Sequence, residues 1–175
     1  MKALKQFSIP FTGLKLGKHQ FEFEIDKSFF DAFEYSLVKD GALKATVELD
    51  KQETMLLLDF HVWGTIQLNC DKCLSEFAQS IELKERQIVK FTEDEGESDD
   101  LDIIILHKKE SAIDVSESIY EFITVAVPYI NSCAQAGQEC DQQMLATLDK
   151  LSGESTTPEE EQNDDPRWAA LKKLK

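Results

Sequence analysis

Two runs of alternating apolar residues flank Cys70-Asp71-Lys72-Cys73, and this pattern constrains the fold more than any other feature of the chain. Before the cysteines, Ile66 and Leu68 lie on one face, and after them Phe77 and Leu83 share one parity. Alternation with a period of two is typical of strands with one buried face. The pattern therefore predicts a β-hairpin with the Cys-x-x-Cys at its turn.

Further alternation predicts a sheet around this hairpin. Strands are expected at 21–25, 43–49, 55–68 and 101–106, and at 77–83, after which 88–91 continues the sheet or starts its next strand. Gly64 interrupts the third of these runs and indicates a bulge. The segment 92–102 contains seven acidic residues and is expected to be a solvated loop.

Three helices are expected in this part of the chain. The first begins at a cap, Asp26 or Ser28, and its apolar face follows the four-residue spacing of Phe29, Phe33 and Leu37 until Asp40-Gly41 ends it. The second spans 114–127, with a capping box of Asp114 and Glu117 at its start and Pro128 at its end. The third follows a cap at Asp141 and runs to Leu151.

These elements define the predicted architecture. Residues 1–151 are expected to form a single α+β domain, with a mostly antiparallel sheet packed by two or three helices. The hydrophobic fraction of 42% supports a globular core. Residues 152–164 are expected to be a disordered acidic linker. Residues 165–175 form a predicted short basic amphipathic helix that begins with Asp165-Pro166.

The sequence also bears on the cellular compartment. The longest apolar runs fall short of the ~20 residues that a transmembrane helix needs. The first residues lack the continuous apolar core of a signal peptide. A cytoplasmic location is therefore expected, and there cysteine thiols stay reduced.

The formal net charge of −15 is unevenly distributed. Residues 1–20 and 166–175 contain eight of the nineteen basic residues and no acidic residue, which leaves the body at 21–165 with a charge of −23. Phosphate neutralisation requires Lys and Arg, so contact with RNA is expected only at the two ends. The acidic body suits a basic partner such as a ribosomal protein, or serves solubility alone.

The four cysteines, Cys70, Cys73, Cys133 and Cys140, are the candidate metal ligands. Four thiolates are a typical ligand set of structural zinc, and a tight Cys-x-x-Cys turn directs both sulfurs to one point. The Cys-x6-Cys spacing of the second pair is longer than usual, and a cluster of buried thiols without metal remains open. A thiol-redox site is disfavoured because such sites place the Cys-x-x-Cys at a helix N-terminus.

Other chemical groups give weaker signals. Glu117 and Glu121 share one helix face, which is more typical of a solvated face than of an acid–base pair. His107 is a minor alternative metal ligand. A phosphate-binding loop, a nucleophile elbow and an HExxH motif are all missing from the sequence. The chain is therefore predicted not to be an enzyme.

The C-terminal helix contains the candidate binding residues Arg167, Trp168, Lys172 and Lys173. An indole beside cations can stack on a nucleobase or insert into a groove of a protein partner. Docking of Trp168 on the chain's own core is an equal alternative.

The order of these features resembles one protein family. Gly64, the Cys70–Cys73 motif, the acidic loop, the helix that ends at Pro128 and the closing segment 165–174 (Asp-Pro-Arg-Trp, then Leu-Lys-Lys-Leu) are similar to the YceD-like large ribosomal RNA subunit accumulation proteins. The resemblance covers residues 20 to 175. The segment 9–15 is similar to a variant found in Bacteroidetes-type bacteria. Other members carry a further Cys-x-x-Cys after the helix-ending proline, where this chain has Cys133 and Cys140.

The resemblance implies a non-enzymatic factor that supports large-subunit ribosomal RNA accumulation, processing and ribosome assembly. Its implied partners are large-subunit ribosomal RNA or its precursor, and a basic ribosomal protein; a membrane or a small-molecule substrate is not expected. Structural zinc is the expected cofactor. The alternative function is a protein–protein adaptor with a structural zinc and no direct RNA contact.

Overall fold

The structure is a computed structural model that describes residues 3–93 and 103–152. The chain separates into two compact units, Met1–Cys140 and Asp141–Lys175. In chain order the first unit contains η1 (Ala3–Phe7), β1 (Ser8–Pro10), β2 (Gly17–Ile25), α1 (Lys27–Phe30), β3 (Asp40–Lys51), β4 (Met55–Asn69), β5 (Glu76–Thr92), β6 (Ile103–His107), β7 (Ala112–Asp114), α2 (Ser116–Ala126) and η2 (Cys133–Ala136). The second unit contains α3 (Gln142–Leu151). The predicted α+β class is confirmed.

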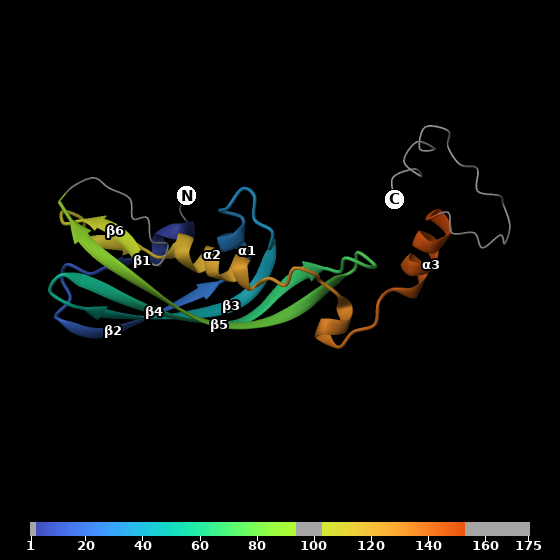
Figure 1. The fold of residues 1–175 in the computed structure, drawn as a ribbon, viewed down its shortest axis with the longest axis horizontal. Coiled ribbons are helices and arrows are strands. Elements are labelled where there is room, and N and C mark those ends of the chain that lie inside the picture. Colours follow the sequence, from blue (N-terminus) through green and yellow to red (C-terminus); the bar gives the residue numbers. More distant parts are fainter. Residues whose placement is uncertain (1–2, 94–102, 153–175) are drawn as a thin grey trace, which may run out of the picture. The chain divides into compact units, whose positions relative to one another are not determined.

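The main sheet has five strands in the order β2-β3-β4-β5-β6 (Figure 1). Strands β2 to β5 pair antiparallel, whereas β6 pairs parallel with β5, so that Ile103 lies opposite Ile88. The short strands β1 and β7 form a separate antiparallel pair. Strand β5 is continuous through 88–91, so this segment continues the strand instead of starting a new one. The mostly antiparallel sheet with its Cys-x-x-Cys hairpin is as predicted.

One face of the sheet forms the hydrophobic core. Alternate side chains of β4 (Leu56, Leu58, Phe60 and Val62) are at most 2% exposed. Helices α1 and α2 lie on the same side of the sheet (Figure 1), and Phe122 of α2 packs edge-on against Phe60 with 5.2 Å between ring centroids. Burial of each such side chain contributes about 1.5–3 kcal/mol. The alternation of apolar and polar residues in the sequence thus corresponds to side chains that point alternately into the core and toward solvent.

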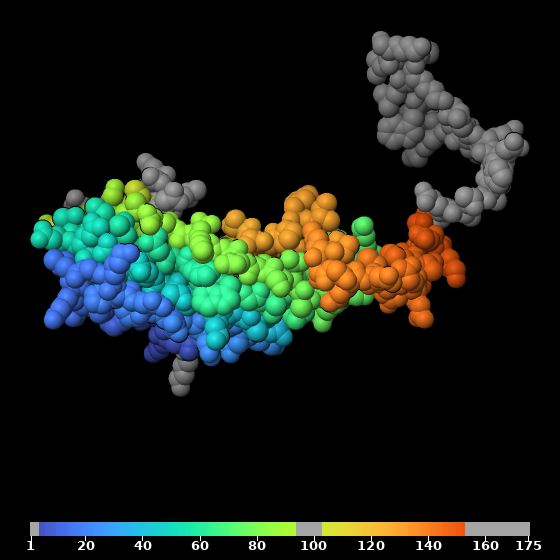
Figure 2. All heavy atoms as spheres, turned by 90° about the horizontal axis from the view of Figure 1, so that it is seen from below, coloured from blue at the N-terminus to red at the C-terminus, as the bar shows by residue number. Residues whose placement is uncertain are grey.

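The opposite face of the sheet carries charged side chains. Figure 2 looks toward this side, where the strands appear as blue, cyan and green surfaces. Cross-strand ion pairs join Lys18 to Glu48 at 2.6 Å, and Arg86 to Asp59 through two hydrogen bonds of 2.6 and 3.1 Å. Both pairs are largely exposed, so they favour solubility and register more than stability.

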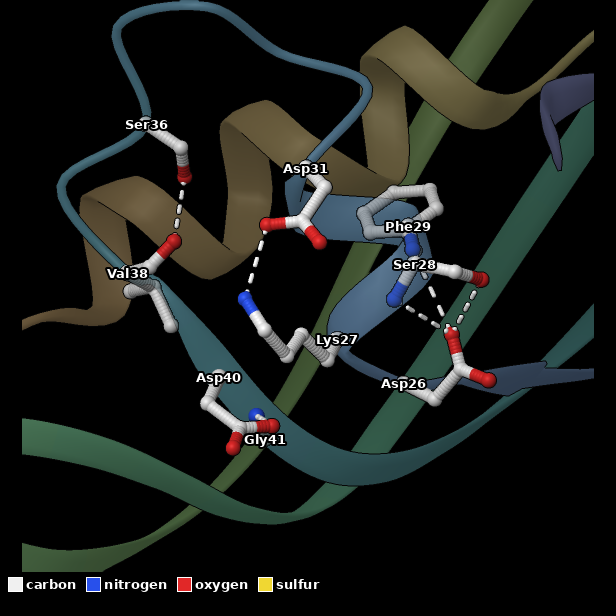
Figure 3. Close-up of polar contacts among 9 residues, drawn as sticks. All are labelled: Asp26, Lys27, Ser28, Phe29, Asp31, Ser36, Val38, Asp40 and Gly41. Carbon is white, nitrogen blue, oxygen red and sulfur yellow. Dashed lines mark hydrogen bonds and ion pairs between the residues drawn. The ribbon is translucent and has the colours of Figure 1, made fainter.

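The prediction of a long helix from Phe29 to Leu37 is wrong, because α1 is a single turn. The Asp26 carboxylate caps it as predicted, since Oδ1 accepts hydrogen bonds from the backbone N–H groups of Ser28 and Phe29 (Figure 3). Phe29 is buried against Phe7, whereas Phe33 stacks on Tyr120 of α2 with 3.9 Å between centroids. The rings of Phe29 and Phe33 also meet edge-on, with 5.3 Å between centroids, so the four-residue spacing reflects one aromatic cluster and not a continuous helical face.

Residues 31–39 connect α1 to β3 without a further helix. The Ser36 hydroxyl donates to the Val38 carbonyl at 2.6 Å, and Asp40, where β3 starts, accepts from the Gly41 N–H (Figure 3). Asp40-Gly41 thus begins a strand and does not end a helix. Leu37, expected on an apolar helix face, is 72% exposed in this connection.

Gly64 lies in an unbroken strand, so the predicted bulge is wrong. Its neighbours pair in continuous register, with Gly64 opposite Leu43 of β3 and Ile81 of β5. Its φ angle of +145° is one that side-chain-bearing residues rarely adopt. A Cβ at this position would clash with the Ala42 carbonyl oxygen and would lie 2.7 Å from Cα of Leu43. The glycine is required by close approach of the two backbones.

Helices α2 and α3 lie where they were predicted. Ile119 and Ile123 place the apolar face of α2 in the core, and the helix ends before Pro128. The capping box is not formed: the N-cap is Val115, and Asp114 instead accepts from the N–H of Ser116 at 2.9 Å. In the second unit, Asp141 caps α3 through the N–H groups of Gln143 and Met144, as predicted.

Several predictions concern residues that the structure does not describe. These are most of the acidic loop at 92–102, the linker at 152–164 apart from Ser152, and the helix at 165–175. None of the described helices is long and apolar enough to cross a membrane.

Candidate metal centre

The Cys-x-x-Cys lies at the turn between β4 and β5. Asn69 and Glu76 are the last paired residues of the hairpin, and the turn closes through hydrogen bonds from Cys70 N–H to the Ser75 carbonyl (2.9 Å) and from Leu74 N–H to the Cys70 carbonyl (2.8 Å). Leu74 adopts a left-handed conformation with φ of +62°. This backbone lets the chain reverse within a few residues and turns Cys70 and Cys73 inward, where both are buried.

The second cysteine pair lies at and after η2, because Cys133 is the first residue of this turn and Cys140 follows it. Ser132, which precedes Cys133, forms a capping box with Gln135. Gly137 ends the turn with φ of +70°, and the Gln138 N–H donates to the Cys133 carbonyl at 2.9 Å. The left-handed glycine reverses the chain so that Cys140 can return toward Cys133.

The structure brings the four sulfur atoms together. Sγ of Cys73 lies 3.6 Å from Sγ of Cys133, Sγ of Cys70 lies 3.9 Å from Sγ of Cys140, and all four lie within 4.8 Å of one another. Four sulfurs at about 2.3 Å from one zinc ion in a tetrahedron would be about 3.8 Å apart. The separations fit such a site, and all four cysteines are free of disulfides.

Burial makes a cation favourable at this cluster. Cys70, Cys73 and Cys133 are at most 2% exposed, and Cys140 is partly buried. Burial raises the pKa of the Cys133 thiol to about 12, and the neighbouring thiols act in the same direction. Burial, followed by the thiols of Cys70 and Cys73, also raises the pKa of Cys140. Four thiolates therefore cannot coexist here unless a bound cation compensates their charge.

Cys70 has the most favourable surroundings for a thiolate. Burial acts to raise the pKa of its thiol, but hydrogen bonds from the backbone N–H groups of Cys73, Cys133 and Lys72 lower the pKa below its ordinary value. Backbone donors of this kind stabilise the charged form of a metal-binding sulfur. The turn thus supplies hydrogen bonds as well as ligands.

A reciprocal pair of hydrogen bonds ties the two cysteine segments together. The Asp71 N–H donates to the Asn131 carbonyl at 2.8 Å, and the Asn131 N–H donates to Oδ2 of Asp71 at 2.7 Å. Asp71 lies between Cys70 and Cys73, and Asn131 precedes Cys133. This connection, which we call the Asp71–Asn131 tether, keeps the second cysteine pair close to the first without any metal.

One family model matches the part of the chain that contains these cysteines. The model described as "Large ribosomal RNA subunit accumulation protein YceD" matches residues 58–175. The chain belongs to the YceD family. The match begins within β4 and includes the rest of the β4–β5 hairpin, α2 and all four cysteines. Searches of curated proteins and of solved structures gave no match.

The other candidate residues that the structure describes in this YceD-family chain are not part of the cysteine cluster. His107 ends β6, and its Nδ1 accepts from the Lys109 N–H at 3.0 Å; the metal-ligand group formed by the described residues contains the four cysteines without it. Glu117 and Glu121 are exposed on α2, as expected for a solvated face. Arg167, Trp168, Lys172 and Lys173 are within the family match but outside the described residues.

Sequence reasoning missed the tether. An aspartate inside a Cys-x-x-Cys turn is a usable signal, because a short carboxylate in a tight turn commonly accepts backbone N–H groups. Asn131 gives no comparable signal, because its part depends on its backbone and on the return of the chain after α2.

Proposed function

We propose that this YceD-family chain is a non-enzymatic cytoplasmic factor that supports accumulation and processing of large-subunit ribosomal RNA and assembly of the large ribosomal subunit. The observation that carries the proposal is the family match, which spans residues 58–175. The fold supports it, because the candidate centre contains four cysteine sulfurs, and a fully protein-ligated metal has no open position for a substrate.

The cofactor of this proposal is one structural zinc ion held by Cys70, Cys73, Cys133 and Cys140. Sulfur separations near those of a tetrahedral thiolate site support zinc over a redox role, as does the position of the Cys-x-x-Cys at a hairpin turn instead of a helix N-terminus. Zinc there would join the hairpin to the segment after α2. Its proposed role is structural, because it would fix the surface formed by these two segments.

RNA contact is assigned to the basic ends of the chain. Phosphate binding requires cations that are free to release counterions. At the N-terminal end, Lys18 pairs with Glu48 at 2.6 Å. At the C-terminal end, the proposed RNA-binding residues are Arg167, Lys172 and Lys173, with Trp168 as a stacking group.

The test is crosslinking of the tagged full chain to RNA in cells, followed by capture and sequencing. Enrichment of a defined site in large-subunit ribosomal RNA or its precursor is expected, and it should fall steeply when Arg167, Lys172 and Lys173 are all changed to Gln. A matched variant with three exposed lysines of the described unit changed to Gln (Lys44, Lys84 and Lys90) should retain it. RNA at background level in the unaltered chain would contradict direct contact.

The second candidate is a protein–protein adaptor with a structural zinc and no direct RNA contact. The net charge of −15 favours it, because an acidic body repels phosphate and attracts basic proteins. Salt separates the two candidates: phosphate contacts weaken steeply between 50 and 200 mM salt, as described for nucleic-acid complexes. If ribosomal RNA is captured only when a protein partner is also bound, the contact with RNA is indirect and the adaptor is favoured.

A further inference from the structure

A groove of about 520 Å³ lies beside the candidate metal centre. Its walls come from the connection before β3, the end of β4, the start of β5 and the segment that follows α2. All of these belong to the first unit. The groove is distinct from the cysteine cluster, but Asp71 and Asn131 contribute to both the groove and the tether.

Large apolar side chains along this groove are left uncovered. Tyr129 is fully exposed and Leu37 is 72% exposed, and both line the groove together with Leu68 and Val127. Exposed aromatic and aliphatic side chains that gather at a concave site are typical of interaction surfaces. Tyrosine in particular supplies contact area at a low cost in conformational entropy.

The charge of the groove selects the class of partner. Asp40, Asp71 and Glu76 line it, and the basic lining residue is Lys39. An acidic rim disfavours RNA, because every phosphate would meet carboxylates. The same rim is complementary to lysine and arginine side chains, which would surround an apolar residue placed against Tyr129 and Leu37.

We propose that this groove binds a Lys- and Arg-rich segment of a large-subunit ribosomal protein, with one apolar or aromatic side chain seated against Tyr129. The choice of a ribosomal protein rests on the proposed function, whereas the basic and apolar character of the segment follows from the groove. The chain would then contact RNA and protein through different surfaces.

The metal centre would set the width of this groove. Asp71 belongs to the turn that contains Cys70 and Cys73, and Tyr129 and Asn131 stand shortly before Cys133. The four cysteines therefore join two segments that both contribute to the groove lining. Groove binding should weaken when the centre is emptied, although no cysteine touches the partner.

The test uses the full chain with p-benzoylphenylalanine in place of Tyr129 as a photo-crosslinking probe. The two binding probes are the RNA-free proteins extracted from purified large ribosomal subunits and, separately, purified large-subunit ribosomal RNA. The control places the same amino acid at Leu16, which is 61% exposed. Leu16 precedes Gly17, whose partner Lys51 is at the opposite end of β3 from Asp40.

Crosslinks from position 129 to a Lys- and Arg-rich segment of one or a few ribosomal proteins are expected, at least about tenfold above position 16. Introducing Glu76→Lys into the position-129 chain should reduce the yield about tenfold, because it places a cation on the acidic rim. The matched change Glu53→Lys, an exposed glutamate in the turn between β3 and β4, should leave the yield unchanged.

Equal yields at positions 129 and 16, crosslinks to ribosomal RNA instead of protein, or insensitivity to Glu76→Lys would each overturn the proposal. Depletion of the chain from cells tests the proposed function separately. If depletion lowers large-subunit ribosomal RNA but position 129 gives no protein crosslink, only the groove assignment is wrong. If ribosomal RNA is unaffected by depletion, the proposed function is wrong whether or not the groove binds a basic segment.

Discussion

The two ends of the β4–β5 hairpin are stabilised by different means. At the end near Leu56 and Val89, the hairpin is flanked by β3 on one side and by β6 on the other, and both residues are fully buried. At the other end, β3 begins opposite Gln67, so the tip beyond that residue lacks this neighbour. The side chains buried at the tip include Cys70 and Cys73.

This difference shows how the sheet can extend beyond its hydrophobic core. The core end is stabilised by apolar area removed from water. The cysteine end leaves Leu74 and Ile130 about 60% exposed (62% and 59%) and is joined to the segment after α2 by the Asp71–Asn131 tether beside the sulfur cluster. Exposed apolar side chains of this kind are available to a partner.

The largest expected effect is confined to the cysteine end. Changing Cys133 to Ser should abolish stoichiometric zinc binding, because a structural site requires all four ligands and contributes folding free energy directly, about 10–16 kcal/mol in zinc-finger peptides. Metal analysis by mass spectrometry should give one zinc per unaltered chain and almost none per variant. Hydrogen exchange should show loss of protection around the Cys70–Cys73 turn while β3 and the core half of β4 remain protected. Equal zinc content in the two chains would contradict the four-cysteine site.

The next largest effect belongs to the core end. Gly64→Ala should lower the free energy of unfolding by about 3–4 kcal/mol, because the added Cβ would clash with the Ala42 carbonyl oxygen and the φ angle is +145°. Urea denaturation measures this change. Gly13→Ala is the matched control, since nothing lies within 4 Å of a Cβ there. A small effect at Gly64 would show that the close approach of β3 and β4 relaxes easily.

A third prediction uses pH to compare the metal-free and zinc-loaded cysteine ends. Without metal, Cys133 has a folded-state pKa of about 12, above the ordinary thiol value near 8.5. A raised pKa favours the folded state below the ordinary value, so stability should fall as pH rises from about 8.5 toward 12. With zinc bound, protons compete for the thiolates, and stability should instead fall as pH decreases. Thermal melts against pH, with and without a chelator, test this reversal. The same pH dependence in both states would argue against metal binding.

The smallest effect concerns the tether. Asp71→Ala removes the acceptor of the Asn131 N–H and should lower the free energy of unfolding by about 1 kcal/mol. It should also weaken zinc binding, because the second cysteine pair is less well positioned. Asp59→Ala is the control and should leave zinc binding unchanged, because it removes only the exposed partner of Arg86 on the face of the sheet opposite the core. Competition with a colorimetric chelator measures both affinities.

Much of the core could be predicted from the sequence, because the alternation in β3, β4 and β5 is the direct signature of one buried face. The hairpin at Cys70–Cys73 followed in the same way, and the end of α2 followed from Pro128. The length of α1 could not be predicted, since Phe29 and Phe33 are spaced as on a helix and contact each other although the helix ends at Phe30. A glycine needed for a bulge and one needed for close strand approach look alike, so Gly64 was misassigned.

The four cysteines of the candidate site could be named from the sequence, whereas the geometry that brings them together could not. Cysteine is rare enough that four of them form a plausible set without knowledge of the fold. The tether and the groove arise only when the segment after α2 returns to the hairpin turn. The parallel pairing of β6 with β5 likewise depends on where the chain goes after Thr92, which local periodicity does not encode.

The short connections between β3, β4 and β5 have a consequence for the order in which this protein folds. Residues that pair across Gln52–Thr54 and Cys70–Ser75 are close in sequence, so their contacts close small loops and form quickly. The sulfur cluster joins residues 60 and 70 positions apart, and Cys133 and Cys140 are synthesised after the strands of the main sheet. The strands should therefore assemble first, and closure of the sulfur cluster should follow.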